Sequence, residues 1–160
     1  GSTYSENALM KARAYAQASG LLTLADDSGL EVDALDGGPG IYSARYGGPG
    51  GSDESRYRLL MHNLARVPAS QRGARFRCAI ALVWPEGREV TVEGILEGRI
   101  TRGPRGSHGF GYDPVFWIDE HGCTMAELPL EIKNTISHRA RAAAQARRIL
   151  ARTLAGNSTS

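Results

Sequence analysis

Two consecutive strand-like segments place the strongest limit on how this chain can fold. Between residues 74 and 84 every second side chain is apolar, and these side chains are Phe76, Cys78, Ile80, Leu82 and Trp84. A period of two is that of a β-strand, whose successive side chains point to opposite faces. A Pro-Glu-Gly-Arg turn follows at 85–88, and residues 89–100 form a second candidate strand. The pattern predicts a β-hairpin in the middle of the chain.

Helical patterns lie on both sides of this hairpin. Residues 5–19 carry an apolar stripe that ends at a glycine, and residues 52–65 begin with a serine that can cap a helix. A last helix is predicted after Ser137, and a short buried strand is predicted at 21–25. This order of elements predicts an α/β fold with a mixed, elongated central sheet flanked by helices.

The composition excludes several classes of protein. The chain has 160 residues, 41% hydrophobic and 22% charged, so we expect a single domain over 1–160. No apolar run approaches the roughly 20 residues that span a bilayer, so no membrane partner is expected. A net charge of +2 is too small to predict stable nucleic-acid binding. Cys78 and Cys123 have no metal-ligand spacing, which favours a reduced, cytoplasmic chain.

An acidic segment follows the predicted strand at 21–25. Asp26 and Asp27 precede Ser28 and Gly29, and we interpret these four residues as a turn at the carboxyl end of the strand. Open α/β sheets bind ligands at this end, and Mg²⁺ is commonly held by one or two carboxylates together with substrate phosphates. A carboxylate beside a metal can also take a proton from an attacking water. The pair is equally typical of an aspartate-rich turn that caps the next segment, so the residues leave both interpretations open.

A glycine-rich loop at 106–114 contains two aromatic side chains. Phe110 and Tyr112 offer faces on which a base can stack, and Gly111 allows the backbone to approach a ligand closely. Asp113 could accept hydrogen bonds from ring nitrogens or an exocyclic amine, and the proline after it predicts an extended conformation. The alternative interpretation is a glycine-rich hairpin loop with aromatic anchors.

Basic residues gather around the start of the last predicted helix. Lys133 lies just before it, and His138 and Arg139 lie in its first turn. The helix dipole attracts anions to this end, so cations here suit the binding of a phosphate or a base carbonyl. The alternative is a capped helix with exposed basic residues. On the first predicted helix, Lys11 could reach a phosphate or could be a solvated surface lysine.

Together these segments resemble one family, the inosine-triphosphate pyrophosphatases, also called non-canonical purine NTP pyrophosphatases. The matching stretches occur in the family's order, from residue 3 to about residue 154, and they are ENALMKARA, ADDSGLEVDALDGGPGIYSARYGG, GFGYDP and EIKNTISHR. The resemblance implies hydrolysis of ITP, dITP and XTP to the monophosphate and pyrophosphate, which cleanses the nucleotide pool. It also implies magnesium (Mg²⁺) as the cofactor and a homodimer.

The resemblance implies a role for each candidate residue. Asp27 would be the general base and a metal ligand, with Asp26 supporting it. The substrate-binding residues would be Ser28, Phe110, Gly111, Tyr112, Asp113, Lys133, His138, Arg139 and Lys11. A cationic donor such as Arg139 or His138 can donate a hydrogen bond to the oxygen at position six of hypoxanthine and xanthine. Adenine carries an amine at this position, so the donor would have no partner.

One part of the family pattern is not found in this sequence. The family opens with a strand and a Thr-Gly-Asn-x-x-Lys loop that cradles the triphosphate. We therefore expect a sheet with the N-terminal strand of the family missing, low stability, and weak or no activity. Two alternatives are kept: a Maf-like pyrophosphatase for other nucleotides, against which GFGYDP and SHR argue, and a catalytically impaired nucleotide-binding fragment. In a non-catalytic protein the basic tail would bind a nucleic-acid backbone with strong salt dependence.

Overall fold

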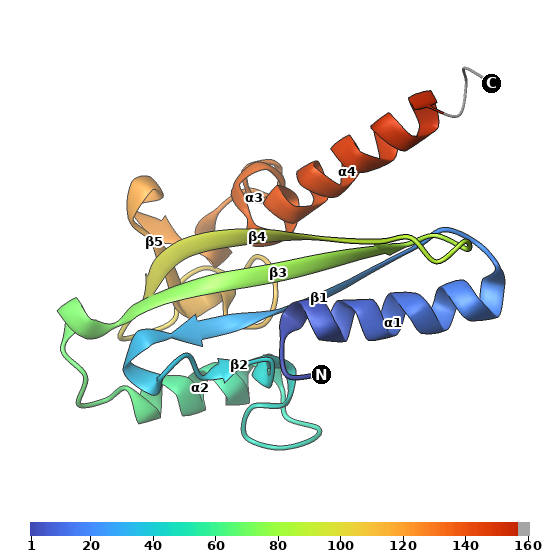
Figure 1. Cartoon of the computed structure of the whole chain (residues 1–160). Helices are drawn as coiled ribbons and strands as arrows, with labels where there is room; N and C mark the ends of the chain where they lie inside the picture. The colour runs from blue at the N-terminus through green and yellow to red at the C-terminus, as the bar shows by residue number, and fades with distance from the viewer. Residues whose placement is uncertain (157–160) are drawn as a thin grey trace.

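A six-stranded sheet forms the centre of the molecule, in the order β2-β1-β3-β4-β5-β6 (Figure 1). The computed structural model describes residues 1–156. The strands are β1 (Thr23–Val32), β2 (Pro39–Gly40), β3 (Gly73–Val83), β4 (Glu89–Ile100), β5 (Phe116–Ile118) and β6 (Cys123–Thr124). The predicted α/β fold with a central sheet flanked by helices is confirmed. All pairings among the described strands are antiparallel, so this part of the chain contributes no parallel pair to a mixed sheet.

Helices cover both faces of the long strands, with α1 on one face and α4 on the other (Figure 1). The α-helices are α1 (Tyr4–Ser19), α2 (Asp53–Asn63), α3 (Leu130–Ile136) and α4 (His138–Gly156). Short 3₁₀ helices connect the other elements, and they are η1 (Asp33–Leu35), η2 (Ser43–Arg45), η3 (Ala69–Gln71), η4 (Asp113–Val115), η5 (Asp119–His121) and η6 (Met125–Glu127). Within residues 1–156, none of the helices has the length and apolar character needed to cross a membrane.

The predicted hairpin is present as β3 and β4, which pair along the whole length of β3. The second half of β3, from residue 78 to residue 83, is buried on both faces because it lies between two helices, whereas buried and partly exposed side chains alternate in the first half. The side chains of β3 toward α4 are Cys78, Ile80 and Leu82, followed by Trp84 just after the strand, and those toward α1 are Ala79, Ala81 and Val83. The facing residues of α1 are also small, namely Ala8, Ala12 and Ala16. Small side chains on both sides let α1 pack directly against the strand.

Capping contacts are present at the ends of these helices, and those at Gly20 and Ser52 are the ones that the sequence predicts. The Thr3 side chain accepts a hydrogen bond from the Glu6 N–H at 3.1 Å, and Gly20 ends α1 in the left-handed conformation with φ 67°. The Ser52 hydroxyl accepts from the Ser55 N–H at 3.1 Å and so caps α2. These two helices therefore begin where the sequence predicts.

The turn predicted at 26–29 is wrong, because these residues lie inside β1. Asp26 pairs with Ile80 and Ser28 pairs with Cys78 on the neighbouring strand. Leu30 is fully buried and continues the alternation, so the strand extends through the polar segment. In a strand, Asp26 and Ser28 point to one face and Asp27 points to the other.

Two further local expectations differ from the structure. Lys133 lies within α3 rather than before a helix, and Ser137 is an extended residue (φ −62°, ψ 155°) that separates α3 from α4. Asp113 begins the 3₁₀ helix η4 instead of being extended. The backbone N–H of Asp113 donates to the Phe110 carbonyl at 3.2 Å, and this tight turn overrides the preference set by the proline that follows.

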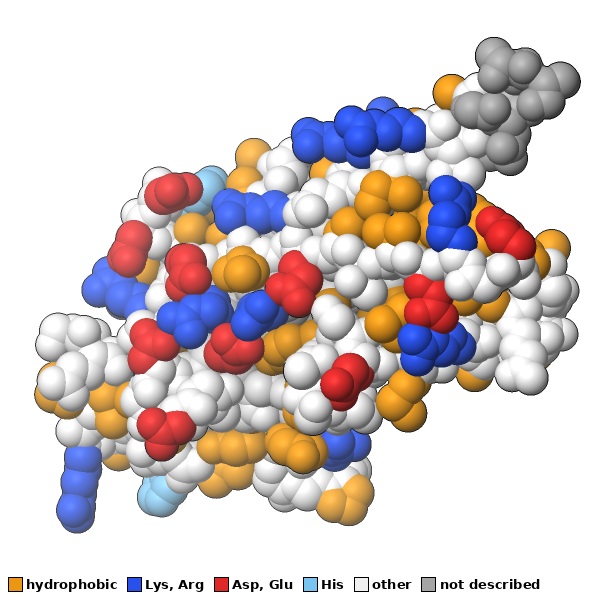
Figure 2. All heavy atoms as spheres, in the orientation of Figure 1, with side chains coloured by type: hydrophobic (Ala, Val, Ile, Leu, Met, Phe, Trp, Pro, Cys, Tyr) orange, Lys and Arg blue, Asp and Glu red, His pale blue; other side chains and the backbone are white. Residues whose placement is uncertain are grey.

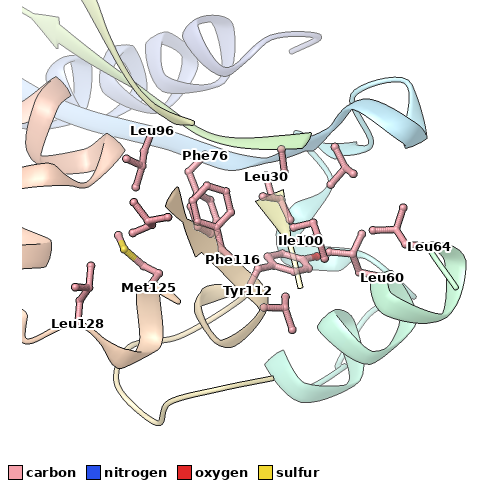
Figure 3. Packing of buried hydrophobic residues seen from close by; sticks show 14 residues of the cluster. Leu30, Leu60, Leu64, Phe76, Leu96, Ile100, Tyr112, Phe116, Met125 and Leu128 are labelled. Carbon is pink, nitrogen blue, oxygen red and sulfur yellow. The ribbon is translucent and has the colours of Figure 1, made fainter. Parts of the chain in front are cut away.

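The largest core lies at one end of the sheet, where the loop after β4 and helix α2 meet the strands (Figure 3). Phe76 and Phe116 pack with their ring centroids 4.3 Å apart. Tyr112 lies among these side chains, and its hydroxyl donates to the Ser43 carbonyl at 2.8 Å. This core anchors both ends of the glycine-rich loop, so the loop is held against the sheet.

Gly94 of β4 lies where the first turn of α4 crosses the sheet. A Cβ atom at this position would collide with the backbone of His138 and of Ala142. We expect Gly94→Ala to lower the free energy of unfolding by about 1–3 kcal/mol, because the helix would have to shift. Urea denaturation measures this, with Gly103→Ala as the control because a Cβ there has no neighbour within 4 Å. Equal stability of the two variants would contradict this packing.

Candidate functional site

Asp27 faces α1 and is held there by two donors from that helix. Its Oδ1 accepts from Lys11 Nζ at 2.9 Å and its Oδ2 accepts from Asn7 Nδ2 at 3.1 Å. Lys11 also donates to the backbone carbonyl of Asp26. The sequence reasoning missed Asn7, although its spacing of four residues from Lys11 places both on one face of the helix. The structure therefore joins two predicted site residues, Lys11 and Asp27.

Arg139 organises the opposite face of β1. Its Nη2 donates to Ser28 Oγ at 2.8 Å, and its Nε donates to Asp26 Oδ2 at 3.3 Å. Its guanidinium carbon also lies 5.3 Å from the centroid of the Phe110 ring, within the range of a cation–π contact. One side chain from α4 thus connects the acidic strand with the glycine-rich loop.

The glycine-rich loop rests on a buried ion pair. Lys133 Nζ lies 2.6 Å from Asp113 Oδ2, which also accepts the Phe110 N–H at 3.2 Å. Burial raises the pKa of Asp113 above its ordinary value, and this effect exceeds the opposing effect of Lys133. Gly109 packs so closely that a Cβ would collide with both charged groups, and its φ is 92°. Only glycine fits this position without strain.

Asp53, at the start of α2, holds the same loop from the other side. Its Oδ2 accepts the Gly111 N–H at 2.7 Å, and its Oδ1 accepts from Arg56 at 2.7 Å. The sequence reasoning did not select Asp53. An acidic residue in the first turn of a helix is already explained by the helix dipole, so its pattern carried no signal of this contact.

The two aromatic residues of the loop point in different directions. Phe110 is 63% exposed, whereas Tyr112 is 5% exposed and belongs to the core. Phe110 therefore offers the face on which a base can stack. The structure does not support the stacking role predicted for Tyr112, because its ring packs against apolar side chains and its hydroxyl donates to the Ser43 carbonyl, although Tyr112 still lines the smaller cavity. Tyr112 therefore anchors the glycine-rich loop to the core.

His138 presents a buried, neutral imidazole to the site. Its ring stacks on Phe76 at 4.8 Å between centroids, and among the described residues its Nδ1 has no hydrogen-bond partner. Burial, followed by the positive charges of Arg139 and Lys133, lowers the pKa of His138 to about 3. The predicted cationic role of His138 is therefore not supported near neutral pH, where the ring can donate or accept one hydrogen bond as a neutral group.

Two cavities open on either side of the Phe110 loop. One, of about 840 Å³, also contacts Lys133, and the other, of about 240 Å³, also contacts Ser28, Asp53 and Arg56. Both cavities are lined by Phe110, Asp113, His138 and Arg139. Most of the substrate-binding residues predicted from the sequence therefore converge. Lys11 and Asp27 line neither cavity and form a separate cluster on the other face of β1.

The donor set for a metal ion is small. Among residues 1–156, no three His, Cys, Asp or Glu side chains converge as they would around an ion. Asp26 and Asp27 point to opposite faces of β1, so they do not form a joint site. Asp27 fits as a single hard-oxygen ligand, which agrees with magnesium sites completed by substrate phosphates and water.

The buried imidazole predicts a pH dependence of stability. The pKa of His138 is about 3 when folded, against 6.5 as its ordinary value, so the unfolded chain binds more protons between these values. The stabilising contribution is complete above about pH 6.5 and decreases as the pH falls. From about pH 7 to about pH 5.5 we expect a loss of about 1 kcal/mol from this group. Urea denaturation at both pH values should show that the free energy of unfolding falls less in His138→Phe than in the unmodified chain.

Exposed His62 provides the control for this experiment. The variant His62→Asn is expected to keep the pH dependence of the unmodified chain. An identical loss of stability on acidification in His138→Phe and in the unmodified chain would contradict the buried, neutral state of His138.

Comparison with solved structures supports the same arrangement of elements. A HAM1 protein from Coxiella burnetii superposes with a TM-score of 0.90 at 44% identity, covering 95% of this chain and 78% of that one. A nucleoside-triphosphatase / dITP/XTP pyrophosphatase from Mycobacterium abscessus has a TM-score of 0.79 at 49% identity, covering 91% and 74%.

Sequence comparison points the same way. A dITP/XTP pyrophosphatase from Geobacter sulfurreducens is 57% identical over 144 residues, which are 90% of this chain and 72% of the relative. A dITP/XTP pyrophosphatase from Leifsonia xyli is 54% identical over 142 residues, 89% of this chain and 71% of the relative. The model of the Ham1 family matches residues 1–149 of this chain. On this combined similarity of sequence and structure, the chain belongs to the Ham1 family.

Proposed function

We propose that this chain hydrolyses the deaminated purine nucleoside triphosphates ITP, dITP and XTP to the monophosphate and pyrophosphate. The observation that carries the proposal is the position of Arg139, which contacts the exposed ring of Phe110 and donates to Ser28. A cationic donor beside a stacking surface suits a purine that carries an oxygen at position six. The relatives at more than 50% identity carry the corresponding activity in their names.

Recognition of the base rests on the Phe110 loop. A purine stacked on Phe110 would place its six-position oxygen toward Arg139, and Lys133 holds Asp113 in the same pocket. Asp113 makes its described hydrogen bonds through Oδ2, so Oδ1 can accept the ring N–H that hypoxanthine and xanthine carry at position one. Adenine has no proton on the ring nitrogen at position one. This nitrogen is itself an acceptor, so it would face the acceptor oxygen of Asp113 without a hydrogen bond. Neutral His138 would add one hydrogen bond.

The residues proposed for hydrolysis lie on the face of β1 that is covered by α1. Asp27 would accept the proton of the attacking water, and Lys11, now 2.9 Å from Asp27, would contact a phosphate oxygen. A magnesium ion, held by Asp27 and the phosphates, would supply charge neutralisation. Asn7 keeps the Asp27 carboxylate oriented. Asp26 would act indirectly, by positioning Arg139.

The proposed substrate class is tested by pyrophosphate release from ITP, XTP, dTTP and UTP in the presence of magnesium. We expect release from ITP and XTP, because both carry the six-position oxygen and the ring N–H. Faster release from dTTP or UTP would favour the Maf-like alternative. Binding of ITP without any release would favour the catalytically impaired fragment.

We also propose that the protein is a cytoplasmic homodimer without a stable nucleic-acid partner. Tyr42 is 55% exposed beside the glycine-rich segment 47–51, which suits contact with a second copy. In the view of Figure 2, acidic and basic side chains are interspersed over the central strands, and a basic group lies over α4. Interspersed charge of this kind does not favour a polyanion. Sedimentation equilibrium would give twice the chain mass for the dimer and the single mass if this proposal is wrong.

A further inference from the structure

Four arginines surround a third cavity, away from the candidate site. It has a volume of about 250 Å³ and lies between the end of β4, the loop that follows and η3. Its charged and aromatic lining is made by Arg72, Arg99, Arg102, Arg105 and Trp117. It shares no lining residue with the two cavities beside Phe110. Any ligand of this cavity therefore binds at a separate site.

The positive charge of this cavity is largely uncompensated. Arg72 is 2% exposed and donates only to the backbone carbonyls of Leu64, Val67 and Thr101. Within the described part of the chain, no carboxylate lies within 4.0 Å of Arg72, Arg102 or Arg105. Burial, followed by the charge of Arg102, lowers the pKa of Arg72. Arg72 is the buried charge of the cluster and has no carboxylate partner among the described residues, whereas Arg102 and Arg105 are exposed and can be reached by a ligand.

Trp117 holds two of the arginines in place. The guanidinium carbons of Arg99 and Arg105 lie 5.5 Å and 5.7 Å from the centroid of its ring. Arg99 also pairs with Asp119 at 2.8 Å, and Asp119 accepts the Trp117 indole N–H at 3.0 Å. A cation–π contact positions a guanidinium without neutralising its charge. Arg102 and Arg105 therefore remain available for a ligand.

We propose that this cavity binds a small phosphoanion, either inorganic pyrophosphate or the phosphate tail of a nucleotide. Planar guanidinium groups bind phosphate oxygens through paired hydrogen bonds, and arginine is well suited to this recognition. The cavity is smaller than the roughly 300–1,000 Å³ of ordinary small-molecule pockets, so it suits a phosphate group rather than a whole nucleotide. The bound anion supplies the counter-charge that the arginines lack.

The experiment uses the fluorescence of Trp117 in a Trp84→Phe background, since these are the two tryptophans of the chain. Pyrophosphate is titrated at constant ionic strength, and we expect a saturable change in emission. The double variant Arg102→Gln/Arg105→Gln should weaken the affinity at least about tenfold, because it removes two charge-assisted contacts. The control double variant Arg88→Gln/Arg147→Gln, which removes the same two charges from exposed positions outside the cavity, should leave the affinity unchanged.

Two further titrations identify what is bound. Equal affinity for tripolyphosphate and ATP would show that the phosphates alone are recognised, and tighter binding of ATP would show that the nucleoside contributes. Lys11→Gln should leave the signal unchanged, because Lys11 is the proposed phosphate contact of the candidate site and lies outside the arginine cavity. The proposal is overturned if sulfate at the same ionic strength gives the same response, or if Lys11→Gln removes the signal and the double variant Arg102→Gln/Arg105→Gln does not.

Discussion

Asp27→Asn is expected to lower kcat for ITP by about 10²–10⁴-fold, the range for loss of a general base. An amide cannot take the proton of the attacking water and is a poorer ligand for magnesium. Asn keeps the shape of the side chain, and its one acceptor oxygen can still accept from Lys11, but the side-chain amide of Asn7 must rotate so that its oxygen accepts from the new NH2 group. Binding of ITP, measured by calorimetry, should persist because the Phe110 loop is untouched. Pyrophosphate release under saturating ITP measures the loss.

The neighbouring carboxylate provides a matched control. Asp26 differs from Asp27 by one position in β1 and therefore points to the opposite face, toward Arg139. Asp26→Asn should change KM more than kcat, because it loosens the side chain that contacts the base. Equal losses of kcat in the two variants, or full turnover by Asp27→Asn, would contradict the assignment of Asp27 as the base.

Arg139→Gln is expected to lower kcat/KM for ITP by about 10–100-fold while changing the slow reaction with ATP little. The variant removes a charged donor, and hydrogen bonds to charged groups contribute about 1.5–3 kcal/mol. It also removes the guanidinium 5.3 Å from the Phe110 ring centroid. Steady-state pyrophosphate release from both nucleotides gives the change in their ratio.

The control for Arg139 is another arginine of the same helix. Arg141 donates to the Ile95 carbonyl at 2.7 Å and lines neither cavity beside Phe110. Arg141→Gln should keep the ratio between ITP and ATP. A parallel fall in kcat/KM for both nucleotides in Arg139→Gln would mean that Arg139 supports the fold or the phosphates and does not select the base.

Local patterns predicted the regular elements because those elements depend on short-range signals. The hairpin of β3 and β4 follows from strict alternation, and α1 follows from its stripe and the terminal Gly20. The structure also has a capping box, formed by Thr124 and Glu127, at the start of η6. These signals act within a few residues, so they are readable without knowledge of the tertiary structure.

The acidic segment could not be predicted in this way. Aspartate, serine and glycine are typical of turns, but at 26–29 the pairing with β3 and the burial of Leu30 and Val32 keep the chain extended. The strand conformation decides the chemistry, because it separates Asp26 from Asp27. Asp26 and Asp27 are adjacent in the sequence and suggest one metal site. In the strand they point to opposite faces of the sheet, where Asp26 contacts Arg139 and Asp27 contacts Lys11.

The geometry of the base-binding loop depends on contacts between distant parts of the chain. Asp113 meets Lys133 across 20 positions and Gly111 meets Asp53 across 58 positions. No local pattern distinguishes the exposed Phe110 from the buried Tyr112, since both are aromatic residues beside glycine. The helix α3, with seven residues, was too short to produce a clear periodic signal. The resemblance to a family supplied these residues, and the structure assigned their separate positions.

The most direct measurement of the central claim is the ratio of kcat/KM for ITP to that for ATP. The two substrates differ only at positions six and one of the base, which are the positions that Arg139 and Asp113 would read. A ratio well above 10² is predicted, because adenine would leave the Arg139 donor and the buried Asp113 carboxylate without their partners. A ratio near one would contradict the account, since base recognition at the Phe110 loop would then make no contribution to the reaction.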